Sequence, residues 1–215
     1  MLNLIIPILL ASNLAISSHS GLSEKSDSLN SLVTPDLVLF ELHGPVNSVT
    51  YHTDNSSSDW TGSLIPMLYD EIRITFDGEG TWDVPPMITH GKSSGDVNPL
   101  HPYERNDDGQ ITEYYRWTEF FAAPSKYKWE NGRPVSCEWK GIDGSGTDYY
   151  TYDDKGNLSK KLTKSFLEGE AYTTTIIYFN YEYDERGNWI SRNWESVEDD
   201  YGKEYSIEKR TIQYY

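Results

Sequence analysis

The sequence predicts an all-β protein built of repeated antiparallel β-hairpins that form a curved, open, meandering sheet with little helix. Three observations predict this class: aromatic residues are abundant, turn-forming residues recur at regular intervals, and no segment has the period of an amphipathic helix. The 215 residues include 17 Tyr, 7 Trp and 6 Phe, although hydrophobic residues make up only 37%. Tyr and Trp bury their rings while a polar tip stays wet, so this composition suits half-exposed sheets.

Short turns of Asp or Asn with Gly separate the expected strands. The glycines that hold equivalent places in these turns are Gly80, Gly109, Gly132, Gly156 and Gly187. The intervals between them are 29, 23, 24 and 31 residues, a spacing typical of a structural repeat. Glycine accepts the positive φ that a tight turn requires, and Asn131-Gly132 is a dipeptide favoured in two-residue type I′ hairpins.

The strands themselves are predicted from alternation and aromatic content. In the stretch IYFNYEYD, one face carries Ile177, Phe179, Tyr181 and Tyr183. Such alternation predicts a strand that buries this apolar face. The earlier stretch DLVLFELHGPVNSVTYHT is predicted to form two strands joined by a turn around Gly44 and Pro45. Residues 54–68 and 84–102 are predicted to be long loops.

The N-terminal part predicts export. Residues 2–17 form an uncharged apolar run followed by small and polar residues, which is the pattern of a signal peptide, here placed at residues 1–20. A membrane span is the competing interpretation, but the run is short and lacks a basic flank. Residues 21–35 are predicted to be a disordered tether, and 36–215 a single β domain. The mature protein is therefore expected outside the cytoplasm, in the periplasm, at the cell surface or secreted, without an integral membrane span.

Charge and cysteine content exclude some functions. A formal net charge of -16 disfavours nucleic acid as a partner, because phosphate binding needs clustered Lys and Arg. Cys137 is the only cysteine, so no intramolecular disulfide can form. Val135, Cys137 and Trp139 share one face of an expected strand, and no base lies nearby, so Cys137 is predicted to be a buried structural thiol.

No catalytic, cofactor-binding or metal-binding constellation is predicted. Asp107, Asp108 and Gly109 suggest a calcium loop, but Tyr115 would occupy the position where a bidentate Glu is needed, so a hairpin turn is favoured. The histidines form no ligand pair of the usual spacing. Acidic neighbours such as Glu198 and Asp199 point to opposite faces of a strand. A hydrolase that uses acidic residues is the least favoured alternative.

The turns YTYDDKGNL and YEYDERGNW closely resemble YD repeats, the Tyr-Asp motifs of Rhs-type bacterial proteins and teneurin shells. The shared pattern is an aromatic residue, a spacer, Tyr-Asp, two or three residues, Gly-Asn and a hydrophobic residue, and only these two turns meet it fully. In YKWENGRPV the Tyr-Asp pair becomes Trp129-Glu130, and in YERNDDGQI the aromatic residue before the turn is absent. The resemblance implies a curved β-sheet spiral. It covers residues 37–215, but too few repeats are present to enclose a cargo.

Surplus aromatic residues are the remaining lead to function. Rings stack on sugar faces and supply rigid contact area in binding sites, although core packing competes for each of them. The candidates for ligand stacking are Tyr114, Tyr115, Trp117, Trp129, Trp139, Trp189 and Trp194. We expect a non-enzymatic secreted or cell-surface binding module for carbohydrate or another envelope component. The alternative is a structural or toxin-associated Rhs-like fragment that binds a protein partner.

Overall fold

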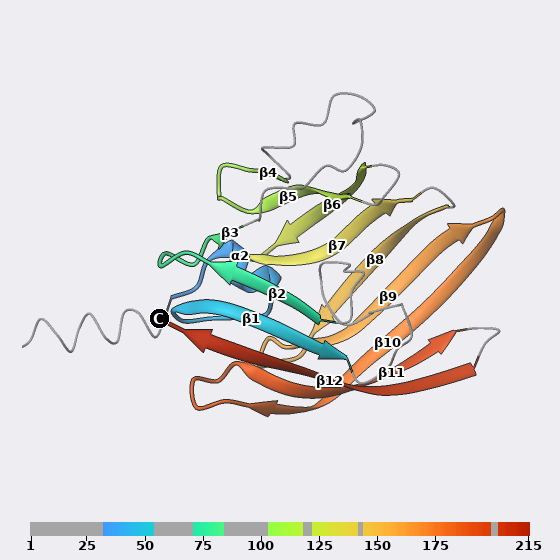
Figure 1. Ribbon diagram of the computed structural model, residues 1–215. Coiled ribbons are helices and arrows are strands. Elements are labelled where there is room, and N and C mark those ends of the chain that lie inside the picture. Colours follow the sequence, from blue (N-terminus) through green and yellow to red (C-terminus); the bar gives the residue numbers. More distant parts are fainter. Residues whose placement is uncertain (1–31, 54–70, 84–102, 118–121, 142–143, 199–201) are drawn as a thin grey trace, which may run out of the picture.

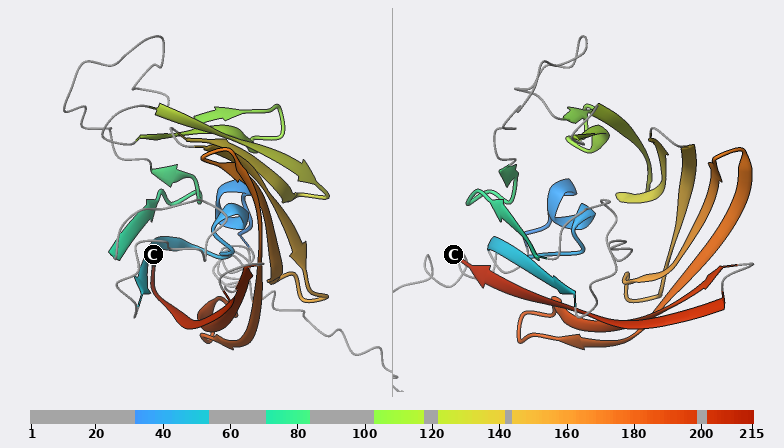
Figure 2. Two further views of the ribbon diagram at one scale, coloured as in Figure 1. Left: turned by 90° about the vertical axis from the view of Figure 1, so that its right-hand side faces the viewer. Right: turned by 45° about the vertical axis from the view of Figure 1, so that its right-hand side comes forward.

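The computed structural model describes residues 32–53, 71–83, 103–117, 122–141, 144–198 and 202–215. These ranges form one antiparallel sheet of 12 strands that curves around a short helix (Figures 1 and 2). The predicted class, an open and curved meandering sheet of hairpins, is confirmed. The predicted loops 54–68 and 84–102, like the signal peptide and most of the tether, lie outside the described residues.

The bounds of the strands, in chain order, are as follows. They are β1 (Val46–Thr53), β2 (Glu71–Phe76), β3 (Trp82–Asp83), β4 (Tyr103–Arg105), β5 (Ile111–Trp117), β6 (Ala122–Glu130), β7 (Arg133–Lys140), β8 (Gly144–Tyr152), β9 (Leu158–Leu167), β10 (Glu170–Tyr183), β11 (Trp189–Glu198) and β12 (Gly202–Tyr214).

The sheet joins the two ends of the described chain. Strands β4 to β12 form a simple meander in which each strand pairs with the next, and β12 then pairs with β1, which leads to β2 and β3. Val49 lies opposite Ile212 and Tyr51 opposite Arg210 across the β1–β12 ladder. As a result β3 and β4, which are consecutive in sequence, form the two edges of the sheet.

The segment predicted to be the first strand is instead helix α2 (Pro35–Leu39), so that prediction is wrong. Thr34 caps the helix, because its side chain accepts a hydrogen bond from the Leu37 amide, and Pro35 begins the helix with a preset φ. Leu37 and Leu39 are almost fully buried. The apolar run that suggested a strand is therefore explained by burial of a helix inside the curve of the sheet (Figure 2).

Four turns at one end of the strands share one geometry, and we call this end the turn rim. The four turns are Asp77–Thr81, Asn106–Gln110, Asp153–Asn157 and Asp184–Asn188. In each, the first side chain accepts bonds from the amides two and four residues later, and the fourth residue is a glycine with positive φ. Two of the three turns that depart from the full motif, those that begin at Asp77 and Asn106, thus fold like the two with full motifs. Asn131 and Gly132 form the fifth, shorter turn.

We call the face of the sheet toward α2 the inner face and the opposite one the outer face. The residue that follows each of the four turns is buried on the inner face: Trp82, Ile111, Leu158 and Trp189. These side chains belong to one hydrophobic cluster with the buried residues of α2 and β1. The hydrophobic position that ends the motif is therefore the point where each hairpin contacts the core.

Strand β10 does not bury one continuous face, as alternation predicts, because the inward face changes along the strand. Ile176 and Tyr178 are buried, whereas Ile177 is 39% exposed. The pairing of β10 with β11 shifts register between Phe179 and Glu182, where Asn180 has a φ of 53°. This bulge reverses the side-chain alternation, so Tyr181 packs inward although Ile177 does not. An unbroken period-two pattern in sequence cannot reveal such a reversal.

Helix α2 holds the two edges of the sheet together. The Asp36 carboxylate is 2% exposed and accepts a 2.7 Å bond from the Trp82 amide on β3. Arg105 on β4 donates two bonds, of 2.6 and 2.7 Å, to the same carboxylate. The Trp82 ring also stacks with Tyr103 on β4 at a centroid distance of 6.3 Å. The sheet stays open, but side chains rather than ladder bonds bring its edges close.

Candidate functional site

A pocket of about 410 Å³ opens at the turn rim, and we call it the rim pocket. Its walls are the segment that follows α2, residues 41–43; the turn at 155–157 with Arg133 and Tyr152; and the next turn with Tyr183, Gly187 and Trp189. Tyr152 and Tyr183 are the tyrosines of the two full Tyr-Asp motifs. The repeats thus supply both sides of the pocket, and the chain after the helix supplies the third.

Trp189 forms the base of the rim pocket and is 2% exposed. Arg210 lies over its ring at 3.6 Å from the centroid, and Arg192 lies over it at 4.2 Å. Within the described part of the chain, its buried indole N–H has no hydrogen-bond acceptor.

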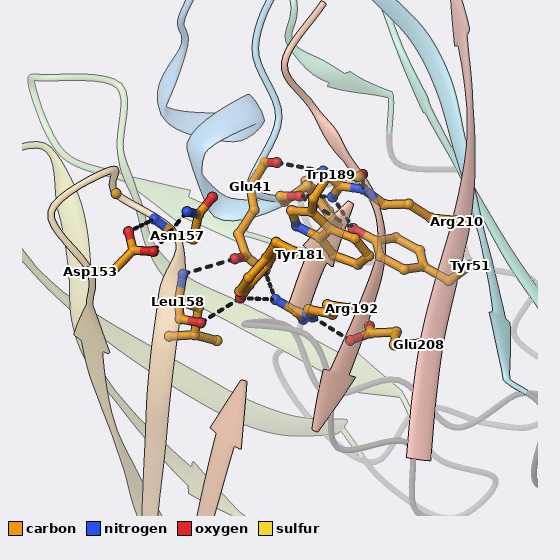
Figure 3. Close-up of polar contacts among 12 residues, drawn as sticks. Glu41, Tyr51, Asp153, Asn157, Leu158, Tyr181, Trp189, Arg192, Glu208 and Arg210 are labelled. Atoms are coloured by element: carbon orange, nitrogen blue, oxygen red, sulfur yellow. Dashed lines mark hydrogen bonds and ion pairs between the residues drawn. The ribbon is translucent and has the colours of Figure 1, made fainter. Parts of the chain in front are cut away.

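A buried ion network supports the pocket from behind (Figure 3). Arg192 donates from Nε to Glu208 at 2.6 Å and from a terminal nitrogen to Glu41 at 2.8 Å. The other Glu41 oxygen accepts a 3.2 Å bond from the Leu158 amide. Burial raises the pKa of Glu208, and Arg192 opposes that rise. Since Arg192 and Glu208 are almost fully buried, this network holds the segment after α2 on the sheet and offers no accessible acid or base.

Arg210 completes this support through hydrogen bonds to the backbone. Its guanidinium donates to three backbone carbonyls: Trp189 at 2.6 Å, Phe40 at 2.8 Å and Glu41 at 2.7 Å. Those carbonyls lie at the end of α2 and at the start of β11. Arg210 therefore fixes the Glu41 backbone, which has a φ of 54°, beside Trp189.

His43 is held by the turn that begins at Asp184. Its backbone N–H donates to the Asn188 side chain at 2.9 Å, and its carbonyl accepts from the Asn188 amide group at 2.9 Å. Its ring contacts the Arg186 carbonyl at 2.8 Å, which places the proton on Nε2. Through these two bonds, Asn188 of the motif YEYDERGNW holds the backbone at His43 in the wall of the pocket.

Arg133 and Lys155 form the cationic side of the rim pocket. Arg133 donates to the Gly156 carbonyl, and its guanidinium lies 5.2 Å from the centre of the Tyr152 ring. Tyr152 is in turn fixed by a 2.8 Å bond to the Pro134 carbonyl. A side chain at Gly156, where φ is 90°, would collide with the Arg133 guanidinium. The glycine of the first motif therefore both makes the turn and admits the arginine.

A second group of polar residues lies on the inner face and is sealed from solvent. Asp148 accepts a 2.7 Å bond from Thr163 and a 3.4 Å contact from the Trp139 indole. Burial lowers the pKa of Lys161 and raises the pKa of Cys137 to about 12. The prediction that Cys137 is a buried thiol is confirmed. The described residues contain no group of His, Cys, Asp or Glu side chains arranged to hold a metal ion.

The structure places most of the predicted stacking residues on the inner face. Tyr114, Trp129 and Trp194 pack against the hydrophobic cluster, and Trp139 lies half-buried beside Asp148. The indole N–H of Trp129 donates a 2.8 Å hydrogen bond to the Ile111 carbonyl. The side chains of Tyr115 and Trp117 lie outside the described residues. For the packed rings, ligand stacking stays a prediction, and only Trp189 lies at the rim pocket.

Sequence reasoning missed several residues of the rim pocket, namely Tyr152, Tyr183, Arg133, Lys155 and His43. One signal for two of them was present, since Tyr152 and Tyr183 occupy the same position in the two full motifs. Of the others, Arg133 follows the short turn at Asn131-Gly132, Lys155 is an exposed residue of the turn 153–157, and His43 lies after helix α2. No local pattern links such distant positions.

The outer face carries a second cluster of exposed rings and aliphatic side chains. Its most exposed members on β8 to β12 are Tyr149, Phe166, Ile177, Val197, Tyr205 and Ile207. Ile177 and Tyr205 lie in one row across the sheet, because both are opposite Glu195. Phe166 lies farther along β9, opposite Ala171. We call this cluster the outer apolar patch.

No protein-family model, curated protein or solved structure matches this chain. Among the described residues, no helix combines the length and apolar character needed to cross a membrane.

Proposed function

We propose that this protein is an exported, non-enzymatic binding module that holds a carbohydrate unit of the cell envelope in the rim pocket. The observation that carries the proposal is the lining of the pocket: two tyrosines and a tryptophan beside planar polar side chains. Rings pack on the C–H faces of sugars, and amide, guanidinium and imidazole groups bond their hydroxyls.

The size and position of the pocket support this function. Its volume of about 410 Å³ lies in the range of small-ligand sites and is suited to one or two sugar rings. Its residues are positioned by backbone caps and a buried ion network, so the site is formed before a ligand binds. The apolar run at residues 2–17 and the resemblance to YD-repeat proteins support an envelope location.

The test is binding to an array of envelope polysaccharides, followed by calorimetry with the best oligosaccharide. Tyr183, which is 40% exposed, is the first residue to change. We expect Tyr183→Ala to weaken binding about tenfold, as loss of one stacked ring costs about 1–1.5 kcal/mol. Tyr149→Ala on the outer face is the matched control and should bind like the unchanged protein. If neither protein binds any glycan, the proposed function is wrong.

A second candidate function is docking of a protein partner on the outer apolar patch. Phe166 and Tyr205 are 55% and 61% exposed, and a patch of this kind marks interaction surfaces. Lys160 lies opposite Ile177, so an acidic protein surface with apolar residues would complement this face. The product of a neighbouring gene is the partner to co-purify. A Phe166→Ser, Tyr205→Ser double variant should lose that partner, whereas retained co-purification would exclude this face.

A further inference from the structure

We propose that the unit held in the rim pocket is acidic, with a carboxylate bound by Arg133 and Lys155. This inference rests on the proposed function and names the ligand class of the same site. It starts from the charges of the lining residues. Besides His43, the ionised groups that line the pocket are one carboxylate, Glu41, and two cations, Arg133 and Lys155.

Glu41 does not neutralise these cations. Its two carboxylate oxygens are engaged by Arg192 and by the Leu158 amide, and its side chain is only 10% exposed. Arg192 also bonds to Glu208, so the Glu41 carboxylate is held within the buried network. Arg133 and Lys155 therefore face the pocket without an ion pair to Glu41, in a chain whose formal net charge is -16.

The motif aspartates next to the pocket keep their charge, but their oxygens are turned to the amides of their own turns. Asp153 accepts bonds from the Lys155 and Asn157 amides of its own turn, and these bonds lower its pKa against the effect of burial. Asp184 likewise accepts from Arg186 and Asn188. Both carboxylates serve their own turns, so they do not fill the space that a ligand carboxylate would occupy.

The guanidinium of Arg133 is prepared for a planar anion. One of its terminal nitrogens is bound to the Gly156 carbonyl, and the Tyr152 ring lies beside its plane at 5.2 Å. A guanidinium carries five N–H donors, so this arrangement fixes its orientation and leaves donors for a ligand. Arginine binds a carboxylate through two parallel bonds, which favours a uronic-acid carboxylate over a neutral hydroxymethyl group.

The pocket suits a planar carboxylate better than the tetrahedral group of a phosphate or sulfate ester. Beyond these two cations the His43 ring also lines the pocket, and it already uses Nε2 on the Arg186 carbonyl. No cluster of backbone amides faces the pocket, since the amides of the adjoining turns are bound to Asp153 and Asp184. A carboxylate together with sugar hydroxyls would match this set of donors.

The experiment compares matched ligands on the full protein by calorimetry. One oligosaccharide carries uronic acids, and the other is the same chain with each carboxylate reduced to a hydroxymethyl group. We expect the acidic form to bind about tenfold more tightly or better, since one charge-assisted bond contributes about 1.5–3 kcal/mol. Equal affinity for the two forms would overturn the inference and leave the proposed function in place. Binding of neither form would instead contradict the proposed function.

Variants then assign the effect to the pocket. Lys155→Gln changes an exposed turn side chain, so the fold should persist; we expect it to lower affinity for the acidic form about tenfold and to leave the neutral form unchanged. Arg133→Gln should do the same. Lys164→Gln, on the outer face, is the control. If the control lowers affinity as much as Lys155→Gln, or if sulfated sugars bind as tightly as uronic acids, the inference is wrong.

Discussion

Arg192 shows how single residues hold this protein together. It joins the segment after α2 to β12 by bonding Glu41 and Glu208, and its side chain is fully buried. It also lies over the rings of Tyr178 and Trp189. A buried charge is tolerated when it is paired, and Arg192 bonds two carboxylates, although one Glu208 oxygen has no partner among the described residues.

Arg192→Met should therefore destabilise the protein strongly. It would leave two buried carboxylates without their cation, at a cost of about 3–5 kcal/mol in the free energy of unfolding. Lys203→Met is the control, because Lys203 pairs with Glu195 at the surface and should cost less than about 1 kcal/mol. Urea unfolding followed by circular dichroism measures both. Similar midpoints for the two variants would contradict the role given to Arg192.

Cys137 should be inert in the folded protein. Burial, together with the nearby Asp148 charge, raises the pKa of its thiol to about 12, so almost no thiolate exists at about pH 8. We expect no reaction with a disulfide reagent under native conditions and one reacting thiol after unfolding in denaturant. A thiol that reacts rapidly before unfolding would show that this part of the inner face is open.

Among the elements, the four turns of the turn rim are the repeating device. Each begins with Asp or Asn, which caps its own backbone, and the fourth residue is a glycine in the left-handed region. All of these interactions lie within five residues. That is why the turns could be predicted from sequence, and why degenerate versions fold alike.

Asp153→Ala should cost about 1–2 kcal/mol in stability. It removes bonds from the Lys155 amide, the Asn157 amide and the Asn157 side chain, although water replaces part of them in this mostly exposed turn. The neighbouring Asp154→Ala is the control, since Asp154 is exposed, and should change stability by less than about 0.5 kcal/mol. Thermal unfolding compares the two variants. Equal losses of stability would contradict the capping role of Asp153.

The stabilisation that the Asp153 cap provides should depend on pH. Although burial opposes it, hydrogen bonds from Asn157, Lys155 and Gly156 lower the pKa of Asp153 in the folded protein. Its stabilisation is therefore present above the unfolded value of about 3.9 and is lost as pH falls through the folded pKa. The difference between the unchanged protein and Asp153→Ala should shrink below about pH 4.

At the scale of the whole molecule, Asp36 is the residue that brings the edge strands together. Asp36→Ala would leave the buried Trp82 amide unpaired and remove both bonds from Arg105, at a cost of about 3 kcal/mol. We expect faster hydrogen exchange of amides in β3 and β4 than in β9 and β10. Glu79→Ala, in the exposed turn beside β3, is the control. Uniform exchange across the sheet in Asp36→Ala would contradict this role.

The buried tyrosines of the inner face lead us to expect that the protein unfolds at alkaline pH. Burial raises the pKa of Tyr51 to about 12, and it raises the pKa values of Tyr127, Tyr150, Tyr152, Tyr178, Tyr181 and Tyr214. Unfolded phenols ionise near about pH 10, so the unfolded state loses protons first and stability falls as pH rises above that value.

The lowered pKa of Lys161 makes stability rise with pH, which opposes the effect of the tyrosines. This is one lysine against seven phenols, so the tyrosines dominate. We therefore expect the phenolate absorbance of the buried tyrosines to rise in one cooperative step, together with loss of the circular dichroism signal of the sheet. Gradual ionisation of all tyrosines near about pH 10 in a folded protein would contradict their burial.

The sequence by itself determined the all-β class, the repeated hairpins and the buried Cys137. These properties depend on local chemistry: turn caps act over four residues, and alternation acts between neighbours in one strand. Alternation failed in β10, where the bulge at Asn180 reverses the faces. It failed at Pro35–Leu39 as well, where the cap Thr34 and Pro35 pointed to a helix that the apolar run concealed.

Only the tertiary structure decided the pairing of β1 with β12, the place of α2 and the composition of the rim pocket. These features depend on contacts between residues that are far apart along the chain. His43 bonds Asn188 across 145 positions, and Arg192 bonds Glu41 across 151. Such contacts form because the curved sheet must cover its apolar inner face, and the N-terminal segment is the part of the chain that does so.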